Sequence, residues 1–239
     1  MGRAIALMSA SGGQGKSTLA CCLAAAAIAA GCSVLLLDCG AGHGALRWLL
    51  GEDLGSAYDL GDASRGACLM GDAVFRCDEG FYMMPSAAND AGVTAAKTCR
   101  IIDAAKKSFD LVIADCPSAG WTDAQTYSQG CDLSIICSTA GRMDLSSASW
   151  LRRALPPEDE KCRLVLMKFS AAAMRRGECA NIDASIDLIC ARLLGVIPYD
   201  ISVAAGNGLP PDSPTAAAAG NIIGRIFGQE IPLDIKSII

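Results

Sequence analysis

Short apolar runs of strand length alternate along the chain with longer segments of helical spacing. Residues 34–37 and 111–114 are hydrophobic at every position, which is the pattern of strands covered on both faces. The alternation predicts an α/β fold, a three-layer sandwich with a mostly parallel, doubly wound sheet. Strands are expected at 4–8, 33–37, 80–84, 111–114, 133–137, 163–167 and 194–197, and helices at 17–30, 44–50, 95–108, 146–154, 181–193 and 216–227.

Two of the predicted strands are followed directly by an aspartate. Asp38 ends the run at 34–37 and Asp115 ends the run at 111–114. Since ligands of open parallel sheets bind outside the carboxyl ends of the strands, both carboxylates are expected at one edge of the sheet. A plainer interpretation of Asp115 is a cap on the turn that leads into Pro117.

The segment 9–18, Ser-Ala-Ser-Gly-Gly-Gln-Gly-Lys-Ser-Thr, joins the first strand to the first helix at the same edge. Gly12, Gly13 and Gly15 let the backbone approach a polyphosphate and adopt positive φ. Lys16 adds a cation, and Ser17 offers a hydroxyl to Mg²⁺, while the helix directs its free N–H groups at the anion. The segment therefore predicts a P-loop, and the alternative is a simple glycine- and serine-rich turn.

Composition narrows the class of protein. The chain has 239 residues, 52% of them hydrophobic, which is enough to bury the core of one domain. We expect this domain to span residues 1–239. No apolar run reaches the length of a membrane span, and the thirteen cysteines lack metal-binding spacing, so reduced core thiols are expected. A net charge of −5 argues against nonspecific nucleic-acid binding.

Several blocks together resemble the MinD/ParA group of deviant P-loop ATPases. They are the loop at 9–18, the segment 37–46, and the segment 109–120 with its Asp-x-Pro. The segments 58–62, 83–86 and 195–203, and the pair Asn207-Gly208, are also similar to that group. The resemblance runs nearly end to end and implies Mg-ATP binding, a nucleotide-dependent homodimer and a protein partner yet to be identified.

Carried over residue by residue, the resemblance implies specific roles. Lys16 would cradle the β and γ phosphates, Asp115 would hold a metal-bound water, and Asp38 would support the Mg²⁺ site, giving Lys16, Asp38 and Asp115 as the catalytic set and Ser17 and Asp115 as the metal set. Nucleotide contacts are implied for Ser11, Gly12, Gly13, Gln14, Gly15, Lys16, Ser17, Thr18, Met167, Lys168 and Pro198.

Three positions depart from the group. Ser11 stands where the group has a signature lysine that reaches the partner's phosphates, and Gly40 stands where it has a second aspartate. Met167 or Lys168 stands where an asparagine reads adenine. A cation supplied in trans is worth about 10³ to 10⁵ in rate, so nucleotide binding is expected to survive better than hydrolysis. We expect turnover to be slow or lost.

The missing lysine is reminiscent of the CpaE/TadZ branch, which acts in pilus assembly, although this chain lacks that branch's receiver-like domain. The main competitors of this branch are the group's cell-division and DNA-partitioning members, which would imply a positioning or partitioning ATPase that acts in cell-pole or division-site localisation. Two further alternatives stay open: a pseudo-ATPase scaffold that ignores nucleotide, and a metal-insertion or amidoligase-like ATPase. The residues 229–239 carry two acids and one lysine, which favours a docked tail over a lipid anchor. We expect a cytoplasmic protein that is not integral to the membrane and is recruited to it peripherally by a partner.

Overall fold

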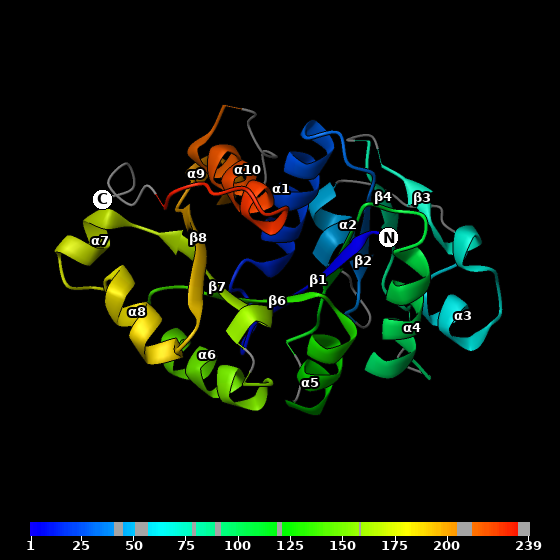
Figure 1. Ribbon diagram of the computed structural model, residues 1–239, viewed down its shortest axis with the longest axis horizontal. Helices are drawn as coiled ribbons and strands as arrows, with labels where there is room; N and C mark the ends of the chain where they lie inside the picture. Colours follow the sequence, from blue (N-terminus) through cyan, green and yellow to red (C-terminus); the bar gives the residue numbers. More distant parts are fainter. Residues whose placement is uncertain are drawn as a thin grey trace.

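The computed structural model describes residues 1–40, 45–50, 57–77, 80–88, 92–118, 121–157, 159–204 and 212–233. Its centre is an eight-stranded sheet in the order β3-β4-β2-β5-β1-β6-β7-β8, with helices on both faces (Figure 1). All the paired strands run parallel except β3 and β4. The expected α/β three-layer sandwich is confirmed.

The strands follow the apolar runs closely. The side chains of β1, β2 and β5 point alternately into two separate apolar clusters, one on each face of the sheet. This arrangement explains why these runs are hydrophobic at every position. The strands are β1 (Arg3–Met8), β2 (Val34–Asp38), β3 (Phe75–Arg76), β4 (Tyr82–Met84), β5 (Leu111–Asp115), β6 (Leu133–Ser138), β7 (Cys162–Phe169) and β8 (Arg192–Pro198).

The helices divide between the two faces. Helices α1, α2 and α10 cover one face, and α4, α5, α6 and α8 cover the other (Figure 1). The bounds are α1 (Lys16–Ala29), α2 (Ala45–Leu50), α3 (Leu60–Arg65), α4 (Ala95–Ala105), α5 (Trp121–Gly130), α6 (Arg142–Ala154), α7 (Ala171–Arg175), α8 (Ile182–Ile189), α9 (Ile201–Ala204) and α10 (Pro214–Ile226). Two 3₁₀ turns lie at Met70–Ala73 and Asp159–Lys161.

The helix expected at 181–193 is too long at its carboxyl end. Helix α8 stops at Ile189, because Cys190 adopts a left-handed backbone with φ 56° and returns the chain to the sheet. A left-handed cap is usually a glycine, so the sequence carries no signal for this stop. Strand β3 and the helices α3, α5, α7 and α9 were not foreseen either.

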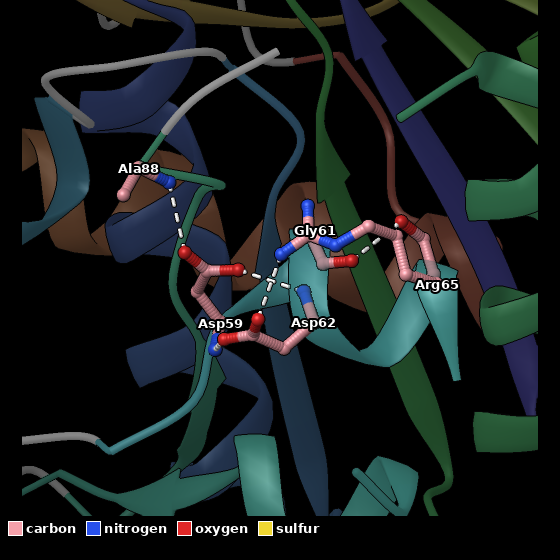
Figure 2. Close-up of polar contacts among 6 residues, drawn as sticks. Asp59, Gly61, Asp62, Arg65 and Ala88 are labelled. Atoms are coloured by element: carbon pink, nitrogen blue, oxygen red, sulfur yellow. Dashed lines mark hydrogen bonds and ion pairs between the residues drawn. The ribbon is translucent and has the colours of Figure 1, made fainter. Parts of the chain in front are cut away.

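Helix α3 begins with a reciprocal cap. The Asp59 carboxylate accepts a hydrogen bond from the Asp62 N–H, and the Asp62 carboxylate accepts one from the Asp59 N–H (Figure 2). The second oxygen of Asp59 accepts the N–H of Ala88 at 2.8 Å, which ties the helix to the segment after β4. A Cβ at Gly61 would lie 3.0 Å from that of Ala87, so a larger residue here would crowd the contact between α3 and the segment after β4. Two of the segments that carry the family resemblance, 58–62 and 83–86, are thus neighbours.

Within the described ranges, every helix falls short of the length and apolar content that crossing a lipid bilayer demands. All thirteen cysteines are free thiols, most of them buried or half-buried.

Candidate functional site

The loop between β1 and α1 has the backbone that its glycines predict. Gly13 and Gly15 have φ values of 75° and 93°, in the left-handed region that favours glycine. Gly15 is the N-cap of α1, and no side chain of the described residues caps the helix there. The first N–H groups of α1 are therefore available to an anion at the helix end.

Lys16 directs its ammonium group back across this loop. Its Nζ donates to the Ser9 hydroxyl at 3.0 Å and to the Ser118 hydroxyl at 2.8 Å. Ser9 follows β1 directly, and Ser118 follows β5 three residues after Asp115. The sequence pattern assigned no individual role to Ser9 or Ser118. No local pattern predicts that a residue following β5 in the chain lies beside Lys16.

Asp115 and Ser17 form the centre of the site. The Ser17 hydroxyl donates to Asp115 Oδ2 at 2.5 Å, while Oδ1 is buried and has no hydrogen-bond partner among the described residues. Burial raises the pKa of the Asp115 carboxyl above its ordinary value, against the opposing effects of the Ser17 hydrogen bond and the Lys16 charge. A buried carboxylate oxygen without a partner is costly unless a cation or donor arrives. The carboxyl is thus poised to gain a positive ligand.

Asp38 lies beside Asp115 in the sheet, as its position at a strand end predicts. The two residues are register partners on the neighbouring strands β2 and β5, and both are buried. Asp38 Oδ1 accepts the backbone N–H of Gly40 at 3.0 Å. A Cβ on Gly40 would lie 3.1 Å from the same oxygen, so a larger residue there would crowd the carboxylate.

Gln14 links the loop to the junction between β6 and α6. Its Nε2 donates to Ser11 Oγ at 3.0 Å and to Asp144 Oδ1 at 2.8 Å, and its Oε1 accepts the N–H of Thr139 at 2.9 Å. The Thr139 hydroxyl in turn donates to the second oxygen of Asp144. Asp144 and Thr139 were missed from the sequence, since they are 130 and 125 residues away from Gln14.

A pocket of about 380 Å³ adjoins the loop where α1 meets the ends of β7 and β8. Met167, Lys168 and Pro198, the residues expected near a base, all line it, together with Gly15 and Thr18. Lys168 has a φ of 52°, at an irregularity in the pairing of β7 with β8, and its Nζ donates to the Gly13 carbonyl at 2.8 Å. The other lining residues are Cys22, Leu49, Ile197, Tyr199, Asp200, Val203 and Thr215.

The structure thus brings the loop residues, both aspartates and the three pocket residues to the carboxyl edge of the sheet. The part of the resemblance that falls on residues 41–44, 119–120 and 207–208 lies outside the described residues.

A parallel sheet whose first strand, glycine-rich loop and helix carry Lys16 and Ser17 opposite a buried carboxylate defines a P-loop nucleotide-binding protein. The model of the CobQ/CobB/MinD/ParA nucleotide binding domain matches residues 5–211, and the chain belongs to that family.

Relatives and solved structures agree with this assignment. The septum site-determining protein MinD of Bacillus subtilis is 30% identical over 98% of this chain and 92% of its own length. The MinC:MinD cell division protein complex of Aquifex aeolicus has a TM-score of 0.85 at 22% identity, over 97% of this chain and 98% of that one. MinD of Pyrococcus horikoshii, solved with Mg-ADP, has a TM-score of 0.80 at 22% identity, over 97% and 100% of the two chains.

Proposed function

We propose that this chain is a single-domain, Mg-ATP-binding positioning ATPase that acts as a nucleotide-gated dimerisation switch and hydrolyses ATP slowly. The observation that carries the proposal is the group of Lys16, Ser17 and Asp115, in which a buried carboxylate oxygen has no partner among the described residues. The relatives named MinD support the positioning role, and the Pyrococcus horikoshii structure, solved with Mg-ADP, supports the choice of ligand.

The residues present fit a nucleotide with its magnesium. Lys16 and the loop from Ser11 to Thr18 would hold the phosphates, because the backbone N–H groups and the ammonium converge there. Ser17 would ligate Mg²⁺, and Asp115 would hold its water, since Mg²⁺ on a nucleotide takes few protein ligands. Asp38 would support the site from behind, and Met167, Lys168 and Pro198 would face the base. Bound Mg²⁺ would supply charge neutralisation at the phosphates.

Two features support slow hydrolysis. The side chain of Ser11 is short and accepts a hydrogen bond from Gln14 within its own loop, so this position offers a partner no cation. Gly40 has no side chain with which to orient a water. Losing a cation supplied in trans costs about 10³ to 10⁵ in rate, whereas binding depends only on the loop, the lysine and the metal.

A binding experiment tests the central claim. Calorimetry with Mg-ATP should give saturable binding for the wild type and a loss of about 100-fold or more for Lys16→Ala, because the ammonium contact to the phosphates is removed. The control is Lys106→Ala, a cation paired with Asp132 at the opposite edge of the sheet, which should leave the affinity unchanged. Equal affinities of wild type and Lys16→Ala would refute the proposal.

The switch is tested by the molar mass in solution with ATP, with ADP and without nucleotide. Gly12, Gly13 and Ser118 are exposed at the loop, so a second copy can cover bound phosphates there. Mass that doubles only with ATP supports the switch. Mass that ignores nucleotide favours the pseudo-ATPase scaffold, which the residues Ser11 and Gly40 make the second candidate.

Phosphate release tests the slow hydrolysis. The wild type should turn over far more slowly than Ser11→Lys, which restores a cation that can reach a partner's phosphates. A Ser11→Gln variant, of similar length but uncharged, is the control and should not gain activity. If Ser11→Lys is no faster than the wild type, the missing lysine is not the reason for slow turnover.

The proposed cellular role is division-site or cell-pole positioning, or pilus assembly, through recruitment to the membrane by a protein partner. The relatives named septum site-determining protein support division-site positioning, and pilus assembly follows only from the resemblance noted in the sequence. Imaging a fluorescent fusion in its own cells, with and without the Lys16→Ala substitution, tests this. A wild-type signal spread evenly through the cell would contradict it.

A further inference from the structure

Gln14 joins the phosphate loop to α6 with both atoms of its amide. The nitrogen donates to Asp144 in the first turn of α6, and the oxygen accepts from the backbone of Thr139 just before that helix. Gln14 is only 7% exposed although it lies in a surface loop. A side chain that is both donor and acceptor is required to make these contacts, and an aliphatic residue could make neither.

Gln14 lies between two glycines of the loop, so its contacts restrain the part of the backbone that is otherwise least restrained. Its neighbours Gly13 and Gly15 are both in the left-handed region, so the backbone here has little restraint from side chains of its own. On the side of the base pocket, Lys168 holds the Gly13 carbonyl. On the side of α6, the Gln14 side chain fixes the loop through its hydrogen bonds with Asp144 and Thr139. The loop is therefore fixed from two directions by groups distant in the sequence.

Asp144 is oriented for this contact by its own partner. One carboxylate oxygen accepts from Gln14 and the other from the Thr139 hydroxyl, while the Gly141 N–H donates to that hydroxyl at 3.2 Å. The network therefore forms a closed set of hydrogen bonds that includes both the loop and the start of α6. A network of this kind is rigid when every member is satisfied.

We propose that Gln14 and Asp144 are positioning residues that hold the phosphate loop in its binding shape before the nucleotide arrives. This inference rests on the proposed Mg-ATP binding. Preorganisation raises affinity because the cost of ordering the loop is met on folding and not on binding.

A double-mutant cycle tests the pair with three variants: Gln14→Glu, Asp144→Asn and the double variant. Gln14→Glu places a carboxylate against Asp144 and should weaken Mg-ATP binding about tenfold. Asp144→Asn removes a charged acceptor and should weaken binding severalfold. In the double variant, the new amide donates to the new carboxylate, and the affinity should return to within about threefold of the wild type.

The sign of the Asp144→Asn effect separates positioning from simple charge repulsion. If Gln14→Glu acted only by adding negative charge near the phosphates, Asp144→Asn would tighten binding and the two effects would add. Additive effects with tighter binding in Asp144→Asn would overturn the proposal. Hydrogen exchange of the loop amides without nucleotide is the second measurement: exchange should be faster in Gln14→Glu and restored in the double variant.

Asp132→Asn is the control for general destabilisation. It is the same chemical change, made at the opposite edge of the sheet where Asp132 pairs with Lys106. It should lower the stability and leave the Mg-ATP affinity as in the wild type. If the wild type itself fails to bind Mg-ATP, the proposed function fails. If the wild type binds and the cycle is additive, only the positioning role fails.

Discussion

Aspartates at the carboxyl ends and at the amino ends of the central strands have opposite environments. At the carboxyl ends of the strands, Asp115 is 5% exposed, and one of its oxygens has no partner among the described residues. At the amino ends, Asp132 precedes β6, and its carboxylate accepts the Ala4 N–H at 2.7 Å and pairs with Lys106 at 2.7 Å. The side chain of Asp132 is also 43% exposed, so water shares in its solvation.

This difference shows where the molecule gives up stability. The amino edge satisfies its polar groups internally and so contributes to folding. The carboxyl edge holds a carboxyl whose charged form is unfavourable until a cation arrives, which is the signature of a binding site. The same chemical group is therefore satisfied within the fold at the amino ends of the strands and is left only partly satisfied at the carboxyl ends.

Among the aspartates compared here, the largest expected effect concerns Asp115. Asp115→Asn keeps the shape and the hydrogen bond from Ser17 but removes the charge that would attract Mg²⁺ and its waters. We expect the gain in ATP affinity on adding Mg²⁺ to fall by about 10- to 100-fold. Titration of ATP with and without Mg²⁺ measures this, with Asp132→Asn as the control. A metal dependence equal to that of the wild type would place the metal elsewhere.

Asp59 tests what decides the effect of replacing an aspartate: its position near the carboxyl ends of the strands, or whether its oxygens have hydrogen-bond partners. It lies toward the carboxyl edge, after β2, yet its oxygens accept from Asp62 and Ala88 (Figure 2). Asp59→Ala should lower the free energy of unfolding by about 1 to 2 kcal/mol, because a helix cap is lost and the Ala88 N–H loses its acceptor. Urea denaturation measures this; Ser64→Ala, on the same helix, is the control and should cost less.

Asp132→Asn and Asp115→Asn should change the stability of the nucleotide-free protein with opposite signs. Asp132→Asn should lower the free energy of unfolding by about 1 kcal/mol, since its ion pair with Lys106, which is only partly exposed to water, is weakened. Asp115→Asn should raise it at neutral pH, because it removes a buried charge that the Ser17 hydrogen bond and the Lys16 charge compensate only in part. Urea denaturation without Mg²⁺ compares the two. A loss in both variants would mean that Asp115 is also a structural group.

The smallest expected effect is on the pH dependence of stability. Because burial raises the pKa of Asp115, the folded state binds its proton more tightly than the unfolded state does. Its contribution to stability is therefore greatest at low pH and is lost as pH rises from the ordinary aspartate range through the raised value. The difference in unfolding free energy, Asp115→Asn minus wild type, should grow with pH in that window and then level off.

Other carboxyls do not obscure this measurement. Hydrogen bonds from the Ser33 backbone and hydroxyl lower the pKa of Asp110, which makes its own contribution run in the opposite direction. That contribution is present in both proteins and cancels in the difference. A difference that does not vary with pH would contradict the burial argument.

The apolar runs predicted the sheet well, because burial on both faces leaves few other ways to arrange such strands. Seven of the eight strands lie at or within two residues of their predicted bounds. Strand β3 was missed, since two residues, one half-buried and one exposed, carry no periodicity. The end of α8 was missed because a cysteine takes a left-handed backbone that a sequence pattern assigns to glycine.

Only part of the site was predictable from the sequence, because some of its residues give a local signal and others do not. The loop, Asp38 and Asp115 are local signals at strand ends, and topology alone brings them together. Ser118, Thr139 and Asp144 act through contacts with residues more than 100 positions away, so no local pattern reveals them. Their partners in the loop, Lys16 and Gln14, were both among the predicted residues.

The antiparallel strand β3 has a consequence for how this protein avoids aggregation. An edge strand offers unpaired backbone groups to any other chain, and parallel sheets with long open edges are prone to unwanted association. Here the outermost strand on one side of the sheet is β3, which is antiparallel to its neighbour and only two residues long. At the other margin, the Arg225 guanidinium takes the carbonyl of Leu194 in β8 and also holds the backbone of Ile231 and Pro232. These features leave few free backbone groups on which a second copy could extend the sheet from either side.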